Sequence, residues 1–273
     1  MLDASRPGRI APKTAGGRRF EASPSPSPDD RISCRATNPL SLDDDLGKVF
    51  LDERQAKATT ATRLFRNAEL FNAITRVCLP AFFQNPRGGK FSMWSTGCSS
   101  GEEVYSMAMI ALDGFARKNK PPLLEIFGTD INRNRILEAR AGVYLPPARN
   151  SLDREYLRLL ANYADLGEHA VKMGELLRST CKFALFDMRN RPKRHTFNFI
   201  VCNHVMQYYD PAGQRHIIGN LKAVLKPGGH IYLEGVTKDG LEGGGLTKLA
   251  GAANMYAVRG TEPFYTASPT SLP

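Results

Sequence analysis

The stretch from Met93 to Ser106 constrains the fold of this chain more than any other part of the sequence. It passes from apolar residues through a turn of small residues into two acidic residues, Glu102 and Glu103. Apolar residues then recur at the spacing of one helix face, at Val104, Met107, Ala108, Ile110 and Ala111. A strand, a Gly/Ser loop and a helix in this order form the first unit of a nucleotide-binding α/β sheet.

The two acidic residues at the start of this helix limit the kind of cofactor. A phosphate site uses bare backbone amides at a helix N-terminus or the Lys of a P-loop, and no Lys or Arg lies between Met93 and Ser106. Carboxylates suit a cofactor that carries positive charge and no phosphate. S-adenosylmethionine, with its sulfonium and ammonium groups, fits this description. Ordinary helix capping stays open as an alternative, because acidic residues in a first turn also favour the helix dipole.

Further apolar segments alternate with helical patterns, which predicts a mostly parallel, doubly wound, Rossmann-like α/β sheet. The predicted strands are Glu125–Asp130, Cys181–Phe186, Phe197–Cys202 and His230–Leu233. Ligands of such sheets bind at the carboxyl ends of the strands. At those ends we expect Gly97, Asp130, Asp187 and Asn203. Asp130 follows the second strand, where an acidic residue accepts hydrogen bonds from ribose hydroxyls, although it is also placed to cap the helix that follows.

Several motifs, in the same order along the chain, resemble the CheR-type chemotaxis receptor methyltransferases. These enzymes esterify receptor glutamates with S-adenosylmethionine. The stretch Trp94–Ser106 is close to the family signature W-S-x-G-C-S-S-G-E-E-x-Y-S. The other matching motifs are TRLFRN at 62–67, LP at 79–80, TDIN at 129–132, ARAGVY at 139–144, VCNHVMQYYD at 201–210 and LKPGG at 225–229. The resemblance runs from about residue 60 to 259.

The resemblance implies an S-adenosylmethionine-dependent methyltransferase and a set of site residues. It places Arg66 and Tyr208 at the methyl-transfer site, where the alternatives are a surface salt bridge for Arg66 and core packing for Tyr208. Transfer to a glutamate asks little of side chains, because the acceptor is already ionised at neutral pH and must only be held in line. The implied cofactor-binding residues are Thr60, Thr62, Arg66, Gly97, Glu103, Asp130, Asp187, Met188, Asn203 and His204.

The chain also departs from the family pattern. The family's Arg-Asn pair is replaced by Asn203-His204, its adenine-contacting Asn by Asp187, and its G-x-S-E by Glu234–Thr237. Only Leu46–Ala61 could supply the family's N-terminal helical domain, which is therefore expected to be reduced or missing. We expect cofactor binding to survive these changes. The acceptor stays open between glutamates of a chemoreceptor-like protein, another acceptor, and a regulatory module that binds the cofactor without methyl transfer.

The sequence divides into four predicted segments. Residues 1–45 are rich in Pro, Ser and Arg and poor in large apolar residues, which predicts disorder. Residues 46–80 form a short helical lead-in that carries the TRLFRN motif, and residues 260–273 a flexible tail. The methyltransferase domain spans 81–259 with an insert at about 144–180. Within the insert, Leu152–Asn162 predicts a helix in place of the family's small β subdomain.

Composition narrows the classes of partner. The net charge is +10, but no basic stretch is interleaved with aromatic residues, so we expect an acidic protein substrate rather than nucleic acid. No apolar run approaches the roughly 20 residues needed to span a bilayer. The 5 cysteines and 5 histidines are scattered, which predicts reduced thiols in a cytoplasmic protein and no metal site.

Overall fold

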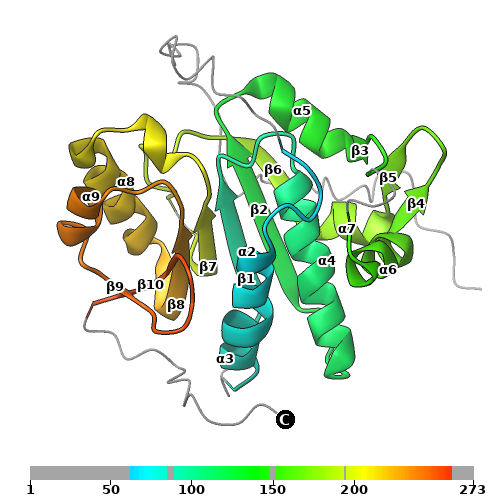
Figure 1. Cartoon of the computed structure of the whole chain (residues 1–273), viewed down its shortest axis with the longest axis horizontal. Coiled ribbons are helices and arrows are strands. Elements are labelled where there is room, and N and C mark those ends of the chain that lie inside the picture. Colours follow the sequence, from blue (N-terminus) through cyan, green and yellow to red (C-terminus); the bar gives the residue numbers. More distant parts are fainter. Residues whose placement is uncertain (1–61, 85–88, 148–151, 194, 260–273) are drawn as a thin grey trace, which may run out of the picture. The chain divides into compact units, whose positions relative to one another are not determined.

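The computed structural model describes residues 62–84, 89–147, 152–193 and 195–259. Its main sheet has 7 strands in the order β6-β2-β1-β7-β8-β10-β9 (Figure 1). All neighbouring pairs from β6 to β8 are parallel, and β10 is antiparallel to β8 and to β9. This confirms the predicted mostly parallel, Rossmann-like sheet. The strands are β1 (Phe91–Thr96), β2 (Leu124–Asp130), β6 (Cys181–Leu185), β7 (Phe197–Cys202), β8 (Leu225–Leu233), β9 (Leu246–Lys248) and β10 (Met255–Val258).

The central strand β1 is buried along its whole length and separates two hydrophobic clusters. Phe91 and Met93 belong to the cluster that includes α4 (Glu102–Arg117), whereas Trp94 belongs to the cluster that includes α8 (Pro211–Ala223). This alternation follows from the two-residue period of a strand. The Trp94 indole donates to Thr129 Oγ1 on β2 at 2.9 Å, so its only polar atom is satisfied in the core.

A helical segment precedes β1 and crosses the predicted boundary at residue 80. It consists of α2 (Ala68–Ala73), a π-helical turn (Ile74–Cys78) and α3 (Leu79–Gln84). Asn67 caps its start by accepting from the Leu70 amide at 3.0 Å. Pro80 has no amide hydrogen to donate within a helix, and the π-helical turn ends two residues before it. The lead-in therefore continues to Gln84 as part of the domain's first cluster.

The insert contains both a helix and a small sheet, so the expectation of a helix in place of the β subdomain was wrong. The helix is α6 (Arg154–Tyr163), and the 3-stranded sheet has the order β3-β5-β4. The Tyr156 ring of α6 stacks on Phe65 with centroids 4.7 Å apart, which holds the insert against the chain before α2. The strands are β3 (Val143–Tyr144), β4 (Ala164–Leu166) and β5 (Val171–Met173), followed by helix α7 (Glu175–Thr180).

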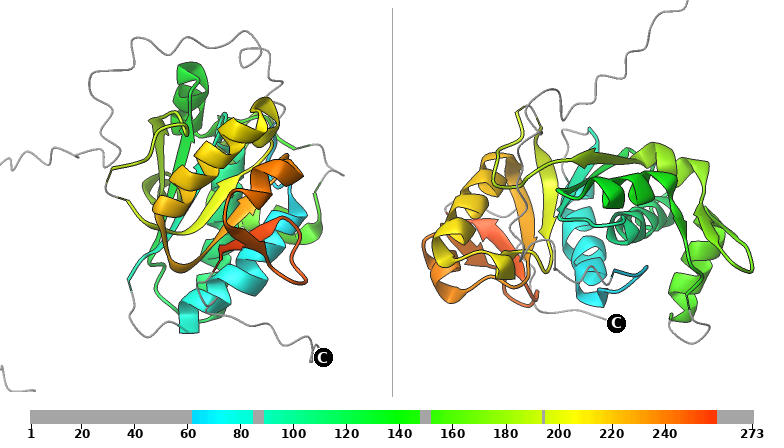
Figure 2. Two further views of the ribbon diagram at one scale, coloured as in Figure 1. Left: turned by 90° about the vertical axis from the view of Figure 1, so that its left-hand side faces the viewer. Right: turned by 90° about the horizontal axis from the view of Figure 1, so that it is seen from above.

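The remaining described helices are α5 (Arg133–Ala141), the 3₁₀ turn η3 (Met206–Tyr208) and α9 (Lys238–Glu242). Figure 1 and the right-hand view of Figure 2 agree that the insert lies at one end of the main sheet and α8 with α9 at the other. The predictions for residues 1–45, Leu46–Ala61 and 260–273 fall outside the described residues. Within the described ranges, no helix has the length and apolar character to cross a membrane, and no cluster of His, Cys, Asp and Glu is placed to hold a metal ion.

Candidate functional site

The turn after β1 requires glycine at position 97. Gly97 has a φ of +72°, and its amide donates to the Thr129 carbonyl of β2 at 2.7 Å. A Cβ at this position would lie 2.4 Å from Val205 Cγ2. Any side chain would therefore collide as well as strain the backbone. Gly97 keeps the ends of β1 and β2 close together at the edge where the predicted site residues gather.

Glu103 is held at the start of α4 by residues from the ends of two neighbouring strands. Its carboxylate accepts from Ser95 Oγ on β1 at 2.8 Å and from Asn203 Nδ2 after β7 at 2.9 Å. Burial raises the pKa of the Glu103 carboxyl, and hydrogen bonds from Asn203 and Ser95 together with the charge of Arg66 offset part of that rise. A positively charged ligand would stabilise the ionised form further.

Asp130 ends β2, and its carboxylate accepts hydrogen bonds from backbone amides. Oδ2 accepts from the Ser99 amide and Oδ1 from the Asn132 amide, both at 2.8 Å. A carboxylate can accept about four hydrogen bonds, more than the amides of Ser99, Asn132 and Ile131 supply, so Asp130 keeps capacity for a ligand hydroxyl. Burial raises the pKa of the Asp130 carboxyl despite these amides. The helix after β2 is capped by Asn132 itself, so Asp130 is not that helix's cap.

Two buried polar atoms at this edge have no hydrogen-bond partner among the described residues. They are Ser99 Oγ in the loop after β1 and Asn203 Oδ1 after β7. Leaving such atoms unpaired costs free energy, and functional sites are where this cost is offset by a ligand. Asn203 Oδ1 can only accept, so it suits a donor such as an ammonium group. The residues present therefore fit S-adenosylmethionine.

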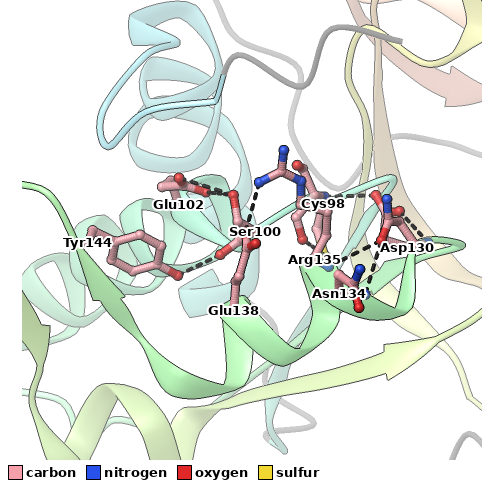
Figure 3. A network of polar contacts seen from close by, with 10 residues as sticks. Cys98, Ser100, Glu102, Asp130, Asn134, Arg135, Glu138 and Tyr144 are labelled. Carbon is pink, nitrogen blue, oxygen red and sulfur yellow. Dashed lines mark hydrogen bonds and ion pairs between the residues drawn. The ribbon is translucent and has the colours of Figure 1, made fainter. Parts of the chain in front are cut away.

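Glu102 lies beside Glu103, and its carboxylate belongs to a polar network that includes Tyr144 of the insert and Asp130 (Figure 3). Its carboxylate accepts from Ser100 Oγ at 2.9 Å, and the Ser100 carbonyl accepts from the Tyr144 hydroxyl at 2.7 Å. Burial raises the pKa of the Glu102 carboxyl, and hydrogen bonds from Ser100 and Thr62 oppose that rise. The predicted binding residue Thr62 is thus engaged with Glu102. Thr60 lies outside the described residues.

Asp187 and Met188 follow β6 and are both buried. The Asp187 carboxylate accepts from the Arg189 amide at 2.9 Å and from its guanidinium Nε at 2.8 Å. The Arg189 guanidinium, which is about half exposed, thus forms an ion pair with the buried Asp187 carboxylate. Met188 packs on Cys202 of β7, with the two sulfur atoms 4.0 Å apart. Both predicted residues reach the carboxyl end of the sheet, but the Asp187 carboxylate is already paired.

Arg66 and Tyr208, which the family resemblance assigns to the methyl-transfer site, are more exposed than Asp187 and Asn203. Arg66 is exposed between Thr62 and α2 and acts electrostatically on Glu103. Tyr208 lies in η3 with 40% of its surface exposed, so the core-packing alternative does not hold for it. Arg66 interacts electrostatically with the Glu103 carboxyl, whereas Tyr208 has no interaction with Glu103 among the described residues.

His204 has a left-handed backbone with φ +56°, and its ring lies close to a residue that the sequence did not select. Its Nε2 lies 3.2 Å from Glu234 Oε2 at the end of β8. Sequence reasoning missed Ser95, Ser99 and Glu234 as site residues. Ser99 is part of the Gly/Ser loop and Glu234 directly follows the fifth predicted strand, so position after a strand was the available signal.

The comparisons with known proteins agree with this geometry. The family model "CheR methyltransferase, SAM binding domain" matches residues 60–237. The chain belongs to this family. Membership confirms S-adenosylmethionine as the cofactor and confirms the family resemblance expected from the motifs.

The chain is also similar to individual proteins named chemotaxis protein methyltransferase. The chain is 31% identical to the chemotaxis protein methyltransferase Cher2 of Pseudomonas putida over 184 residues, which is 65% of this chain and 66% of that protein. It is 28% identical to the chemotaxis protein methyltransferase of Escherichia coli over 179 residues, 64% of this chain and 59% of that protein. The matched part of the chain thus spans less than two thirds of the length of these relatives.

Proposed function

We propose that the chain transfers the methyl group of S-adenosylmethionine to glutamate carboxylates of a protein substrate. The observation that carries the proposal is the pairing of Glu103 with Ser95 and Asn203 at the sheet edge, beside the unpartnered Ser99 Oγ and Asn203 Oδ1, in a chain of the CheR family. The names of the relatives support a substrate in chemotaxis signalling, such as a receptor-like protein.

The proposed roles follow from the chemistry of each group. Asp130 has free acceptor capacity for ribose hydroxyls, and Asn203 Oδ1 with Glu103 suits the ammonium group. Asp187 and Met188 are assigned to the adenine end by the family motifs. When bound, the cofactor supplies a methyl group activated by its positive sulfur. The chain itself binds, orients and excludes water, which is the part of catalysis that positioning provides.

On the acceptor side, Arg66 is suited to hold a carboxylate because its planar guanidinium binds both oxygens at once. Tyr208 is assigned to donate a hydrogen bond that orients the same group. The formal charge of +10 favours the approach of an acidic protein segment. A glutamate acceptor has no proton to lose at neutral pH, so this reaction needs no base.

The test is labelling from S-adenosylmethionine that carries a radioactive methyl group, with a lysate of the cells that encode the chain as the source of acceptors. Methyl esters are hydrolysed by mild base, so we expect label in protein that is released as volatile methanol. Complete absence of protein labelling, with cofactor binding intact, would contradict the proposal and favour either a non-protein acceptor or a regulatory module that binds the cofactor without methyl transfer.

A further inference from the structure

The segment that carries Arg66 is fastened to the rest of the fold on both sides of that residue. On one side, the Phe65 amide donates to Ser106 Oγ on α4 at 2.9 Å. The Phe65 ring is buried and stacks on Tyr156 of α6. Phe65 also has a left-handed backbone with φ +55°, a conformation that costs free energy for a residue with a Cβ and is found preferentially at functional sites. These contacts hold the backbone directly before Arg66.

On the other side, the Asn67 side chain ties the start of α2 to the end of β8. Its Oδ1 accepts from the Leu70 amide at 3.0 Å. Because a backbone amide can only donate, this contact fixes which end of the side chain is the oxygen. Nδ2 therefore faces β8, where it donates to Glu234 Oε1 and to the Tyr232 hydroxyl, both at 3.1 Å. One side chain thus caps a helix and binds a residue 167 positions further along the chain.

The partners of Asn67 on β8 are themselves held in place. Glu234, whose side chain is 17% exposed, accepts at the same Oε1 from the Tyr232 hydroxyl at 2.6 Å and from Asn254 Nδ2 at 3.3 Å. Burial and the hydrogen bond to Glu234 raise the pKa of Tyr232, so its hydroxyl keeps its proton and remains a donor. A carboxylate that accepts from three side chains is a fixed anchor for Asn67.

We propose that Asn67 and Glu234 form a positioning pair that sets the place of Arg66 at the methyl-transfer site. The inference rests on the proposed function, in which Arg66 holds the acceptor carboxylate, and adds the contact that locates it. Arg66 and Glu234 both act electrostatically on Glu103, so the three charged groups lie in one neighbourhood. Glu234 belongs to the stretch that replaces the family's G-x-S-E, so this pair is a feature of the chain rather than of the family pattern.

The pair matters because Arg66 is exposed. An exposed arginine loses rotamer freedom when it binds a ligand, and a mobile backbone would add to that loss. With the backbone held at Phe65 and at Asn67, only the side chain of Arg66 remains to be ordered. Methyl transfer depends steeply on geometry, since a displacement of about 1 Å can lower a rate by about 100-fold.

Variants of Asn67 separate its cap from its contact with Glu234. Asn67→Ser keeps an oxygen that can cap α2 but is too short to reach Glu234. Asn67→Asp also keeps the cap and turns a carboxylate toward the Glu234 carboxylate, which repels it. With labelled S-adenosylmethionine and lysate protein as the acceptor, we expect both variants to lower the rate of base-labile labelling, by up to about 100-fold. Their affinity for S-adenosylhomocysteine in calorimetry should equal that of the wild type.

The decisive variant restores the contact with its direction reversed. When Glu234→Gln is added to Asn67→Asp, the glutamine amide donates to the aspartate, and the labelling rate should return close to the wild-type value. Glu234→Gln alone should change little, because its amide oxygen still accepts from Asn67. Asn254→Gly is the matched control. It removes another hydrogen bond to the same Glu234 oxygen, at a φ of +55° that suits glycine, and should leave the rate unchanged.

A second measurement is independent of turnover. The order parameter of the Arg66 backbone amide in nuclear magnetic resonance should have the value of a rigid backbone in the wild type, about 0.85, fall in Asn67→Ser and recover in the double variant. Wild-type labelling without rescue by the double variant would overturn the inference and leave the proposed function standing. If the wild type labels no protein while the order parameter follows the variants, the proposed function fails and the positioning pair remains. An Asn67→Ser variant with unchanged rate and unchanged order parameter would also overturn the inference.

Discussion

Glu103 shows how one residue links the fold to the proposed cofactor site. Ser95, Glu103 and Asn203 come from β1, α4 and the end of β7, and their side chains form one chain of hydrogen bonds across the carboxyl edge of the sheet. Because burial raises the pKa of Glu103, its ionised form is costly in the free protein. A cationic ligand offsets this cost by stabilising the ionised carboxylate. The site should therefore prefer a positively charged ligand to a neutral one.

Cofactor affinity should therefore depend on pH through Glu103. As pH falls through the raised pKa, Glu103 takes up a proton and its attraction for a cation disappears, so binding of S-adenosylhomocysteine, whose amino group is positive, should weaken. The folded free protein binds more protons than the unfolded chain above the ordinary value of 4.5, so its stability falls as pH rises through that window. Calorimetric titration at several pH values tests this. Glu103→Gln should bind more weakly and lose the pH dependence, and an unchanged profile would contradict the assignment.

Asp130 supports a second prediction at the residue scale. Asp130→Ala removes an acceptor placed for ribose hydroxyls, and each lost hydrogen bond to a charged group is worth about 1.5–3 kcal/mol. We expect the affinity for S-adenosylhomocysteine in calorimetry to fall by that amount or more. Asp130→Asn keeps one acceptor oxygen and should lose less. Equal affinity in wild type and both variants would show that the second strand does not bind the ribose.

At the scale of elements, long patterned segments were predictable and short paired ones were not. Helix α4 and strands β1, β2 and β7 follow their sequence patterns closely, because burial on one or both faces sets the residue types. Strands β9 and β10 are 3 and 4 residues long and form by pairing with each other and with β8, which leaves too little periodicity to detect. The small sheet of the insert escaped prediction for the same reason. Glu234 likewise reaches the site through tertiary contacts, with His204, Asn67 and Asn254.

The stacking of Tyr156 on Phe65 joins the insert to the segment that carries Arg66, and this contact is testable. Tyr156→Ala removes a partly buried ring that also contacts Phe71, so we expect a loss of about 1–3 kcal/mol in unfolding free energy, below the value for a fully buried aromatic. Tyr156→Phe keeps the ring and should be nearly neutral. Urea unfolding followed by fluorescence measures both. A neutral Tyr156→Ala would show that the insert is held by its other contacts, such as the 2.5 Å ion pair of Arg117 with Glu155.

At the scale of the whole molecule, the site draws on segments spread over most of the described chain. Its residues come from the segment before α2, the start of α4 and the carboxyl ends of β1, β2, β6, β7 and β8. The fold brings together segments that are 100 or more residues apart in the sequence. Only the folded chain holds these groups together, so ligand binding must stabilise the fold as a unit. At a ligand concentration 100 times the dissociation constant, the gain is about 2.7 kcal/mol.

Thermal unfolding with and without S-adenosylhomocysteine tests this coupling, and two glycines provide a matched pair. For a domain of this size the gain corresponds to a rise in melting temperature of roughly 5–10 °C. Gly97→Ala places a Cβ 2.4 Å from Val205 at φ +72°, whereas Gly251→Ala meets nothing within 4 Å at φ +74°. Both carry the same backbone strain, about 1 kcal/mol, but only the first displaces the loop between β1 and α4. We therefore expect Gly251→Ala to melt slightly lower and keep the full ligand-induced rise, and Gly97→Ala to melt lower still and lose it. A full rise in Gly97→Ala would place the cofactor away from this loop.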